Sequence, residues 1–180
     1  MDEDRSDEAD DRGDATAFEQ LMSSVDQPMY VLTAFDGTER SGCLIGFAAQ
    51  ASIRPPRFMV MISKENHTYG VATAAPAVVV HLLRAGDEAI AERFGELTGD
   101  DVDKFDGLDV IEGPARAPVL VGLDWFAGRV LRTLDCGDHV GLLRAAREGP
   151  GRRVEAQRLV DDGPHPRQPV PVADQRQRPR

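Results

Sequence analysis

The sequence predicts a mainly β protein with short helices, an α+β chain organised as a closed antiparallel barrel. Short apolar runs without charged residues recur along it, the clearest at 43–48, 58–62 and 77–83. Turn-forming pairs such as Asp36-Gly37 and Pro55-Pro56 lie between such runs. Uncharged runs bounded by turn residues are typical of buried strands, and many of them with only small helices favour a closed barrel.

The first elements are expected to be a helix and a hairpin. Residues 16–24 place three apolar side chains on one helical face, because positions three and four apart are neighbours on a helix. Residues 30–35 form the first strand, and the turn at Asp36-Gly37 returns the chain into a second strand that begins near Ser41.

A pair of prolines divides the next apolar region. Pro55-Pro56 cannot donate hydrogen bonds to a sheet, and the residue before a proline is held extended. We therefore expect residues 50–57 to be an exposed crossing between the strands at 43–48 and 58–62.

Two helices flank the third apolar run. Residues 68–75 are expected to form one or two helical turns that Pro76 closes. The strand at 77–83 follows, and residues 87–97 then form a longer helix for which Asp87 can be the N-cap.

The last strands are expected at four places, namely 110–111, 118–123, 125–134 and 137–143. The acidic loop at 99–109 precedes them and invites a calcium interpretation. It lacks the ligand spacing and the late glutamate of an EF-hand, so we expect no metal site.

Polar side chains gather where the two central strands end. Gln50, Ser52, Ser63, Asn66 and Thr68 supply hydrogen-bond donors, Lys64 supplies a positive charge and His67 an imidazole. A phosphomonoester binds to several donors and at least one cation, and free N–H groups at the start of a helix attract the same anion. The alternative is that these residues are ordinary turn formers.

Four segments, in this order, resemble the flavin reductase-like family, whose domain is the FMN-binding split barrel. They are MYVLTAFDG (29–37), GCLIGFAAQASIRPPRFMVMISKENHTY (42–69), FGELTGDDVDKF (94–105) and GDHV (137–140). The resemblance covers about residues 20–143 and sharpens the predicted barrel to a split barrel.

The resemblance implies an NAD(P)H:flavin oxidoreductase. Such an enzyme binds FMN, or alternatively FAD, and passes a hydride from NADH or NADPH to the flavin. The reduced flavin then serves a partner monooxygenase or another acceptor. The family also implies a homodimer with the flavin near the subunit interface. This chemistry belongs to the cofactors, which suits a sequence without an evident nucleophile.

The resemblance also assigns roles to residues. The phosphate end of the flavin is expected at Ser52, Ser63, Lys64 and Thr68. Asn66 and His67 are expected to shape the same turn. The ring and ribityl chain are expected to be lined, mainly through backbone groups, by Gly46, Phe47, Ala48, Ala49 and Gln50.

Backbone groups matter most at Gly46, which allows a close approach because it has no Cβ. Gly46 and Ala49 lack side-chain donors that are common at these places in the family. The catalytic candidate is His139, whose tautomer Asp138 could hold. The alternative is a structural hydrogen bond between the two residues.

Other classes of function stay open. A flavin- or haem-binding barrel without turnover could act as a carrier or sensor, because fold does not determine function. Haem would need an exposed axial ligand, for which His67, His81 and His139 are the candidates. Deazaflavin-dependent reduction is a third possibility, which the S-K-x-N-H-T turn at 63–68 disfavours.

Length and charge exclude several classes. A chain of 180 residues is expected to hold one domain with tails, and its net charge of −10 argues against nucleic acid and against anionic membranes. No apolar run approaches the roughly 18 residues that span a bilayer, and we see no signal peptide. We expect a cytoplasmic protein, with Cys43 as a small reduced core residue.

Three regions divide the chain. Residues 1–15 are nearly all acidic and are predicted to be disordered, and residues 16–143 form the flavin reductase-like domain. Residues 144–180 are rich in Arg and Pro. This last segment is interpreted as disordered, as a polybasic anion-binding tail, or as the product of a shifted reading frame.

Overall fold

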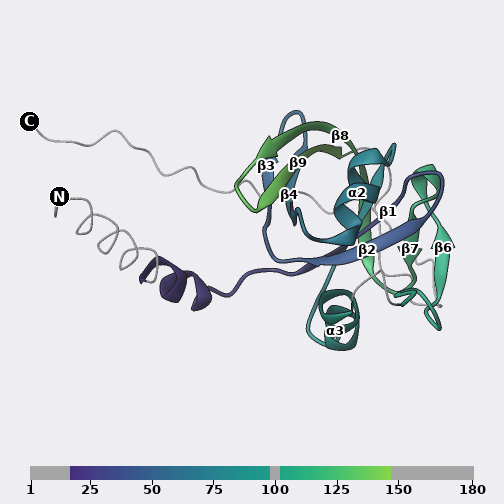
Figure 1. Cartoon of the computed structure of the whole chain (residues 1–180), viewed down its shortest axis with the longest axis horizontal. Helices are drawn as coiled ribbons and strands as arrows, with labels where there is room; N and C mark the ends of the chain where they lie inside the picture. The colour runs from purple at the N-terminus through teal and green to yellow at the C-terminus, as the bar shows by residue number, and fades with distance from the viewer. Residues whose placement is uncertain (1–16, 98–101, 147–180) are drawn as a thin grey trace, which may run out of the picture.

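The strands form one seven-stranded antiparallel sheet and a separate two-stranded ribbon (Figure 1). The structure is a computed structural model that describes residues 17–97 and 102–146. The sheet order is β2-β1-β5-β8-β9-β4-β3, and the ribbon pairs β6 with β7. The strands are β1 (Tyr30–Phe35), β2 (Arg40–Ile45), β3 (Ala48–Ser52), β4 (Arg57–Ser63), β5 (Val78–Leu82), β6 (Val110–Glu112), β7 (Pro118–Leu120), β8 (Asp124–Asp135) and β9 (His139–Ala146).

Helices are few and short, so the predicted mainly β composition is confirmed. Residues 17–23 are helical, as the sequence indicated. The other helices are α2 (His67–Ala74), α3 (Glu88–Glu96) and the single 3₁₀ turn η1 (Pro114–Arg116). None of the helices in the described ranges is both long and apolar enough to cross a bilayer.

Most strands lie where the sequence predicted them, but β3 is a correction. We expected residues 50–57 to be a crossing, whereas β3 continues to Ser52 and pairs with β4. The apolar run at 43–48 is broken instead, at Gly46 and Phe47. This break lets the chain leave its pairing with β1 and start a new one with β4. The two prolines stay in the turn at 53–56, where no sheet donor is needed.

The position of the Asp87 cap was predicted correctly, but its hydrogen bond was not. Asp87 is the N-cap residue of α3 and makes no side-chain cap hydrogen bond to the helix. Its carboxylate accepts from the backbone N–H of Arg84 at 2.9 Å instead. The carboxylate therefore stabilises the tight turn before the helix.

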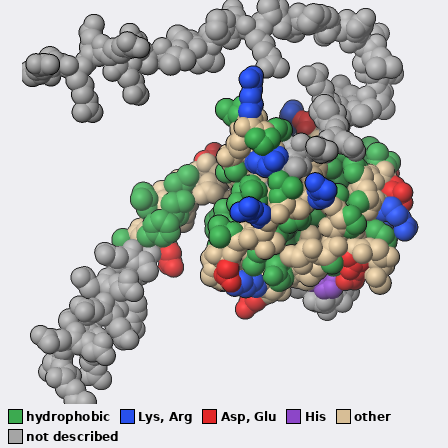
Figure 2. Space-filling model, turned by 90° about the horizontal axis from the view of Figure 1, so that it is seen from above, with side chains coloured by type: hydrophobic (Ala, Val, Ile, Leu, Met, Phe, Trp, Pro, Cys, Tyr) green, Lys and Arg blue, Asp and Glu red, His purple; other side chains and the backbone are tan. Residues whose placement is uncertain are grey.

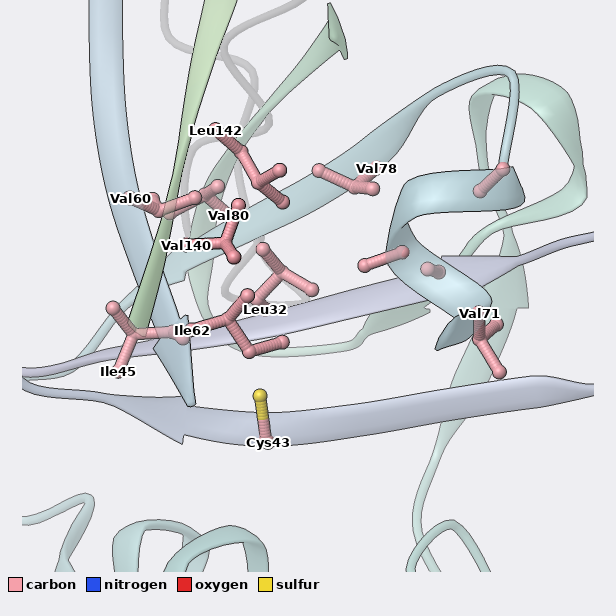
Figure 3. Packing of buried hydrophobic residues seen from close by; sticks show 13 residues of the cluster. Leu32, Cys43, Ile45, Val60, Ile62, Val71, Val78, Val80, Val140 and Leu142 are labelled. Carbon is pink, nitrogen blue, oxygen red and sulfur yellow. The ribbon is translucent and has the colours of Figure 1, made fainter. Parts of the chain in front are cut away.

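The sheet curls around one apolar core, as the side chains in Figure 3 show. Cys43 and Ile45 on β2 point to the same interior as Val60 and Ile62 on β4. Yet β2 and β3 are the two edges of the sheet, and no ladder between them occurs in the described strands. The structure therefore shows a curled open sheet, and the closed barrel that we predicted is not confirmed.

A second apolar cluster fastens α3 and the 102–105 loop to the outside of β1 and β2. Phe94 and Phe105 pack edge to face with ring centres 5.4 Å apart. Beside them the buried Lys104 ammonium donates to the carbonyl oxygens of Gly42 and Phe94, each at 3.2 Å. Burial lowers the pKa of Lys104. A buried ammonium group is stable only with hydrogen-bond acceptors, and these two carbonyl oxygens provide them.

The ends of the chain meet the predictions only in part. The last strand continues to Ala146, three residues beyond the predicted end at 143. The tail predicted from 144 onward thus begins as sheet. The interpretations of residues 1–15 and of residues after 146 fall outside the described residues.

His81 is buried at the centre of the sheet and uses both ring nitrogens. Its Nδ1 lies 3.1 Å from the carbonyl oxygen of Val31, and its Nε2 accepts from the backbone N–H of Leu120 at 3.0 Å. Nδ1 is therefore the protonated nitrogen of a neutral ring. Burial lowers the pKa of His81 from 6.5 to about 4.

This histidine should make the fold less stable in mild acid. The unfolded chain binds a proton at His81 near pH 6.5 and the folded chain only near pH 4, so stability falls as the pH drops through that window. A shift of this size corresponds to about 3 kcal/mol. Urea unfolding of wild type and His81→Gln at several pH values measures it. Equal slopes for both proteins would contradict the assignment.

Candidate functional site

Strands β3, β4, β9 and β8 turn one face away from the core. On β4, the side chains of Phe58, Val60 and Ile62 pack inward. Alternate residues of a strand point to opposite faces. The outward side chains of β4 are therefore Arg57, Met59, Met61 and Ser63.

The strand register aligns these side chains with partners on the neighbouring strands. We call the resulting set the outer strip. From one end to the other, its aligned rows are Ser52, Arg57 and Arg129; then Ala49, Met59, Leu143 and Arg132; then Met61, Gly141 and Leu134; and finally Ser63 and His139.

The middle of the outer strip is apolar. Met59 and Met61 are half-buried, and Gly141, which is aligned with Met61, has no side chain. A Cβ on Gly141 would lie 3.1 Å from the Met59 sulfur, closer than most real contacts. Phe47 borders this area, half exposed, with its ring centre 5.3 Å from that of His139. A flat ring system can rest on such a floor.

Lys64 stands at the His139 end of the strip and is already paired. Its Nζ lies 2.9 and 3.0 Å from the two carboxylate oxygens of Asp135. This bond and the N–H of Gly137 lower the pKa of Asp135. A phosphate can therefore use Lys64 only by competing with Asp135.

His139 and Asp138 are paired as the sequence suggested. Nδ1 of His139 lies 2.9 Å from a carboxylate oxygen of Asp138, and the pairing lowers the pKa of that carboxyl. The other ring nitrogen of His139 can then serve a ligand on the strip. A catalytic role for His139 stays a prediction.

The turn before α2 uses most of its own backbone donors. The N–H groups of Lys64, Glu65 and Asn66 donate to the Asp138 carbonyl, the Ser63 hydroxyl and the Ser63 carbonyl. Asn66 caps α2 by accepting from the N–H of Thr68 at 2.9 Å. The helix N-terminus is thus less open to an anion than we expected.

Thr68 was predicted to bind phosphate, and the structure places its hydroxyl elsewhere. Thr68 is buried, and its Oγ1 lies 2.8 Å from Oγ of buried Ser41. The Thr68 hydroxyl therefore satisfies a polar group inside the core.

Cys43 is also buried as predicted, and burial raises the pKa of its thiol to about 12.

A single phosphate shared by Ser52, Lys64 and Thr68 is also wrong. Ser52 is aligned with Arg57 at the start of β4, six residues before Ser63. At about 3.3 Å per residue this separation is roughly 20 Å. Ser52 and Ser63 lie on the same face but at opposite ends of the outer strip.

The remaining predicted residues divide between the faces. Ala49 points outward, whereas Ala48 and Gln50 align with the inward Val60 and Phe58. The Gln50 amide donates to the Ser52 carbonyl at 3.3 Å. At Gly46 a Cβ would meet only the Met29 side chain, its methyl at 3.6 Å and its sulfur at 3.7 Å. The protein itself therefore does not require glycine there.

His67 faces a different hollow, a cleft of about 710 Å³ between the β1–β2 hairpin, the 102–105 loop and η1. Its Nε2 lies 3.4 Å from a Glu39 carboxylate oxygen. None of the other predicted site residues lines this cleft. Its exposed arginines are paired internally, Arg40 with Asp103 and Arg116 with Glu112. We therefore take the outer strip as the candidate site.

A metal has no evident place in the described part of the chain, where no group of three or more His, Cys, Asp or Glu side chains could hold one. Asp103 of the acidic loop pairs with Arg40 at 2.6 Å. Asp100 and Asp101 lie outside the described ranges.

Sequence reasoning missed the apolar middle of the strip and the arginines at the end opposite Lys64. Met59 and Met61 looked like parts of a run buried on both faces. Alternation counted from Arg57 to Ser63 would have shown that these residues face outward together. No local pattern points to Arg129 or Arg132, because only the pairing through β9 brings them to this face.

Comparison with known proteins agrees with this architecture. The family model described as "Flavin reductase like domain" matches residues 22–146, which include every row of the outer strip. The chain belongs to the flavin reductase-like family. The matched region begins within the helix at 17–23 and ends with β9.

Individual relatives are distant but consistent. NADH:FAD oxidoreductase SgcE6 of Streptomyces globisporus C-1027 superposes with a TM-score of 0.68 at 25% identity, covering 74% of this chain and 80% of that one. FMN reductase (NADH) RutF of Methylorubrum extorquens is 27% identical over 127 residues, 70% of this chain and 62% of its own length.

Some relatives are much longer proteins. Diflavin flavoprotein A 1 of Synechocystis is 23% identical over 123 residues, which is 67% of this chain. The chain spans only 22% of the length of that relative. The domain of this family is therefore also used inside larger flavoproteins.

The buried Thr68–Ser41 contact yields a stability test. Thr68→Val keeps the shape but leaves the Ser41 hydroxyl without its partner, so we expect a loss of about 1–3 kcal/mol in unfolding free energy. Thr68→Ser keeps a hydroxyl and should lose less. Urea denaturation compares the three proteins. A Val variant as stable as wild type would return Thr68 to the list of ligand contacts.

Proposed function

We propose that the protein is an NAD(P)H:flavin oxidoreductase that binds FMN or FAD on the outer strip. Family membership supports flavin reduction, and the observation that carries the location is the apolar floor between two polar ends. The relatives named as an FMN reductase and as an NADH:FAD oxidoreductase support the same chemistry.

The flavin would supply the hydride-accepting ring when bound, and the protein would supply the surface that binds it. Met59, Met61 and Gly141 would carry the ring, while Phe47 borders it. Ser63 and Lys64 would hold the phosphate end, with backbone groups of residues 46–50 beside it. Phe47 and His139 would exclude water on that side, because their rings pack together.

The His139–Asp138 pair would orient the imidazole toward the ring edge. A carboxylate on Nδ1 sets which nitrogen carries the proton. With Nδ1–H donating to Asp138, Nε2 is an acceptor. This residue would therefore position a ligand.

We further propose a homodimer in a closed split-barrel arrangement, working in the cytoplasm with a partner monooxygenase or another acceptor. Exposed apolar side chains support a subunit contact: Phe18 is 63% and Leu21 64% exposed on the N-terminal helix. A reductase that releases reduced flavin needs a consumer for that product.

The alternative is a flavin- or haem-binding barrel without turnover. His81 cannot serve as an exposed haem ligand, because it is buried and both ring nitrogens have partners. His139 is paired with Asp138 and His67 lies beside Glu39. The geometry therefore favours flavin over haem.

Activity decides between the reductase and the carrier. The full chain is mixed with NADH or NADPH and with FMN, FAD or riboflavin, and nicotinamide oxidation is followed by absorbance. We expect oxidation that depends on both the flavin and the protein. Flavin binding without oxidation above background would favour the carrier.

Charge at Lys64 should distinguish FMN from riboflavin, which has no phosphate. Lys64→Ala should weaken FMN by about 1 kcal/mol, at the modest end for an exposed charge, and leave riboflavin unchanged. Asp135→Asn releases Lys64 from its carboxylate and should tighten FMN. Titration of flavin fluorescence measures both effects. Equal losses for FMN and riboflavin would contradict this role of Lys64.

A further inference from the structure

The backbone register brings three arginines to the end of the outer strip opposite Lys64. Arg57 and Arg129 are both aligned with Ala145 of β9, one on each side. Two strand spacings separate their backbones, about 10 Å. Arg132 is in the next row of β8, and the hydroxyl-bearing Ser52 is aligned with Arg57.

These arginines lack acidic partners among the described residues. The salt bridges there join Arg40, Lys64, Arg84 and Arg116 to carboxylates, and none includes Arg57, Arg129 or Arg132. Seen from above, Lys and Arg side chains stand among apolar ones, with acidic side chains mostly at the margins (Figure 2). A positive cluster is notable on a chain with a net charge of −10.

The two ends of the strip differ in charge. At one end, Lys64 pairs with Asp135 and His139 pairs with Asp138. At the arginine end the described residues provide no carboxylate partner for these guanidinium groups, and a bound anion would offset their like charge. A guanidinium fork also matches two phosphate oxygens at once.

We propose that Arg57, Arg129 and Arg132, with the Ser52 hydroxyl, bind the diphosphate of a dinucleotide ligand. Three guanidinium groups spread over this width suit two linked phosphates better than one. FMN with its phosphate at Ser63 and Lys64 leaves this end free. A dinucleotide that uses it therefore lies on the Met59–Met61 floor in the opposite direction, as FAD, or stacks its nicotinamide ring on a bound flavin. The inference rests on the proposed function, and the dinucleotide is FAD or the nicotinamide cofactor.

Binding measurements on the full chain test the proposal. Isothermal titration with FMN, FAD, NADH and inorganic pyrophosphate is carried out on wild type and on the double variant Arg129→Gln/Arg132→Gln. We expect pyrophosphate and one dinucleotide to weaken at least about tenfold, as for lost charged hydrogen bonds, with FMN unchanged. Whether FAD or NADH weakens identifies the ligand.

Two controls separate charge, shape and folding. Arg129→Lys/Arg132→Lys keeps the charge and should restore part of the affinity. Arg116→Gln removes one charge from η1 and should leave all four ligands unchanged. The exposed positions of Arg129 and Arg132 predict an unaltered melting temperature, which thermal unfolding checks.

The possible outcomes distinguish a failure of this anion-site proposal from a failure of the proposed reductase function. Unchanged affinities for FAD, NADH and pyrophosphate in the Gln variant, or no pyrophosphate binding by wild type, overturn it. An equal loss of FMN affinity also overturns it, because the flavin monophosphate would then occupy this end. If wild type binds pyrophosphate but reduces no flavin, the anion site stands and the reductase proposal fails.

Discussion

The antiparallel register that joins β3, β4, β9 and β8 is the constraint on which this molecule depends. Period-two alternation sends Val60, Ile62 and Leu142 into the core and Met59, Met61 and Gly141 to the outside. A slip of one residue would exchange these sets, exposing the core and burying the arginines. The same pairing therefore stabilises the fold and assembles the candidate site.

The site uses both strand ends for opposite purposes. Around Lys64, carboxylates from the β8–β9 hairpin balance the positive charges, so a ligand must compete for them. Around Arg57 and Arg129 the described structure offers positive charge without that competition. An elongated ligand with an uncharged ring in its middle and an anionic end suits this gradient, as flavins and nicotinamide dinucleotides do.

Buried polar groups tie the surrounding elements together. His81 links β1, β5 and β7, and Lys104 links the 102–105 loop to β2 and α3. Thr68 and Ser41 join α2 to β2. Each group is satisfied by a partner distant in sequence. The sequence therefore offered Thr68 as a phosphate contact and His81 as a candidate haem ligand, whereas the structure makes both of them supports.

The sequence by itself determined the class of fold, most strands, the turn at Asn66 and the family, because apolar periodicity, turn residues and motifs are local. It also pointed to Phe47, Ser63 and His139, which the structure brings to one end of one face. Only the tertiary structure decided that Ser52 lies at the opposite end, that the Thr68 hydroxyl faces Ser41, and that Arg57 and Arg129 share a row. The physical reason is that hydrogen-bonded register and side-chain direction arise between strands far apart in the chain.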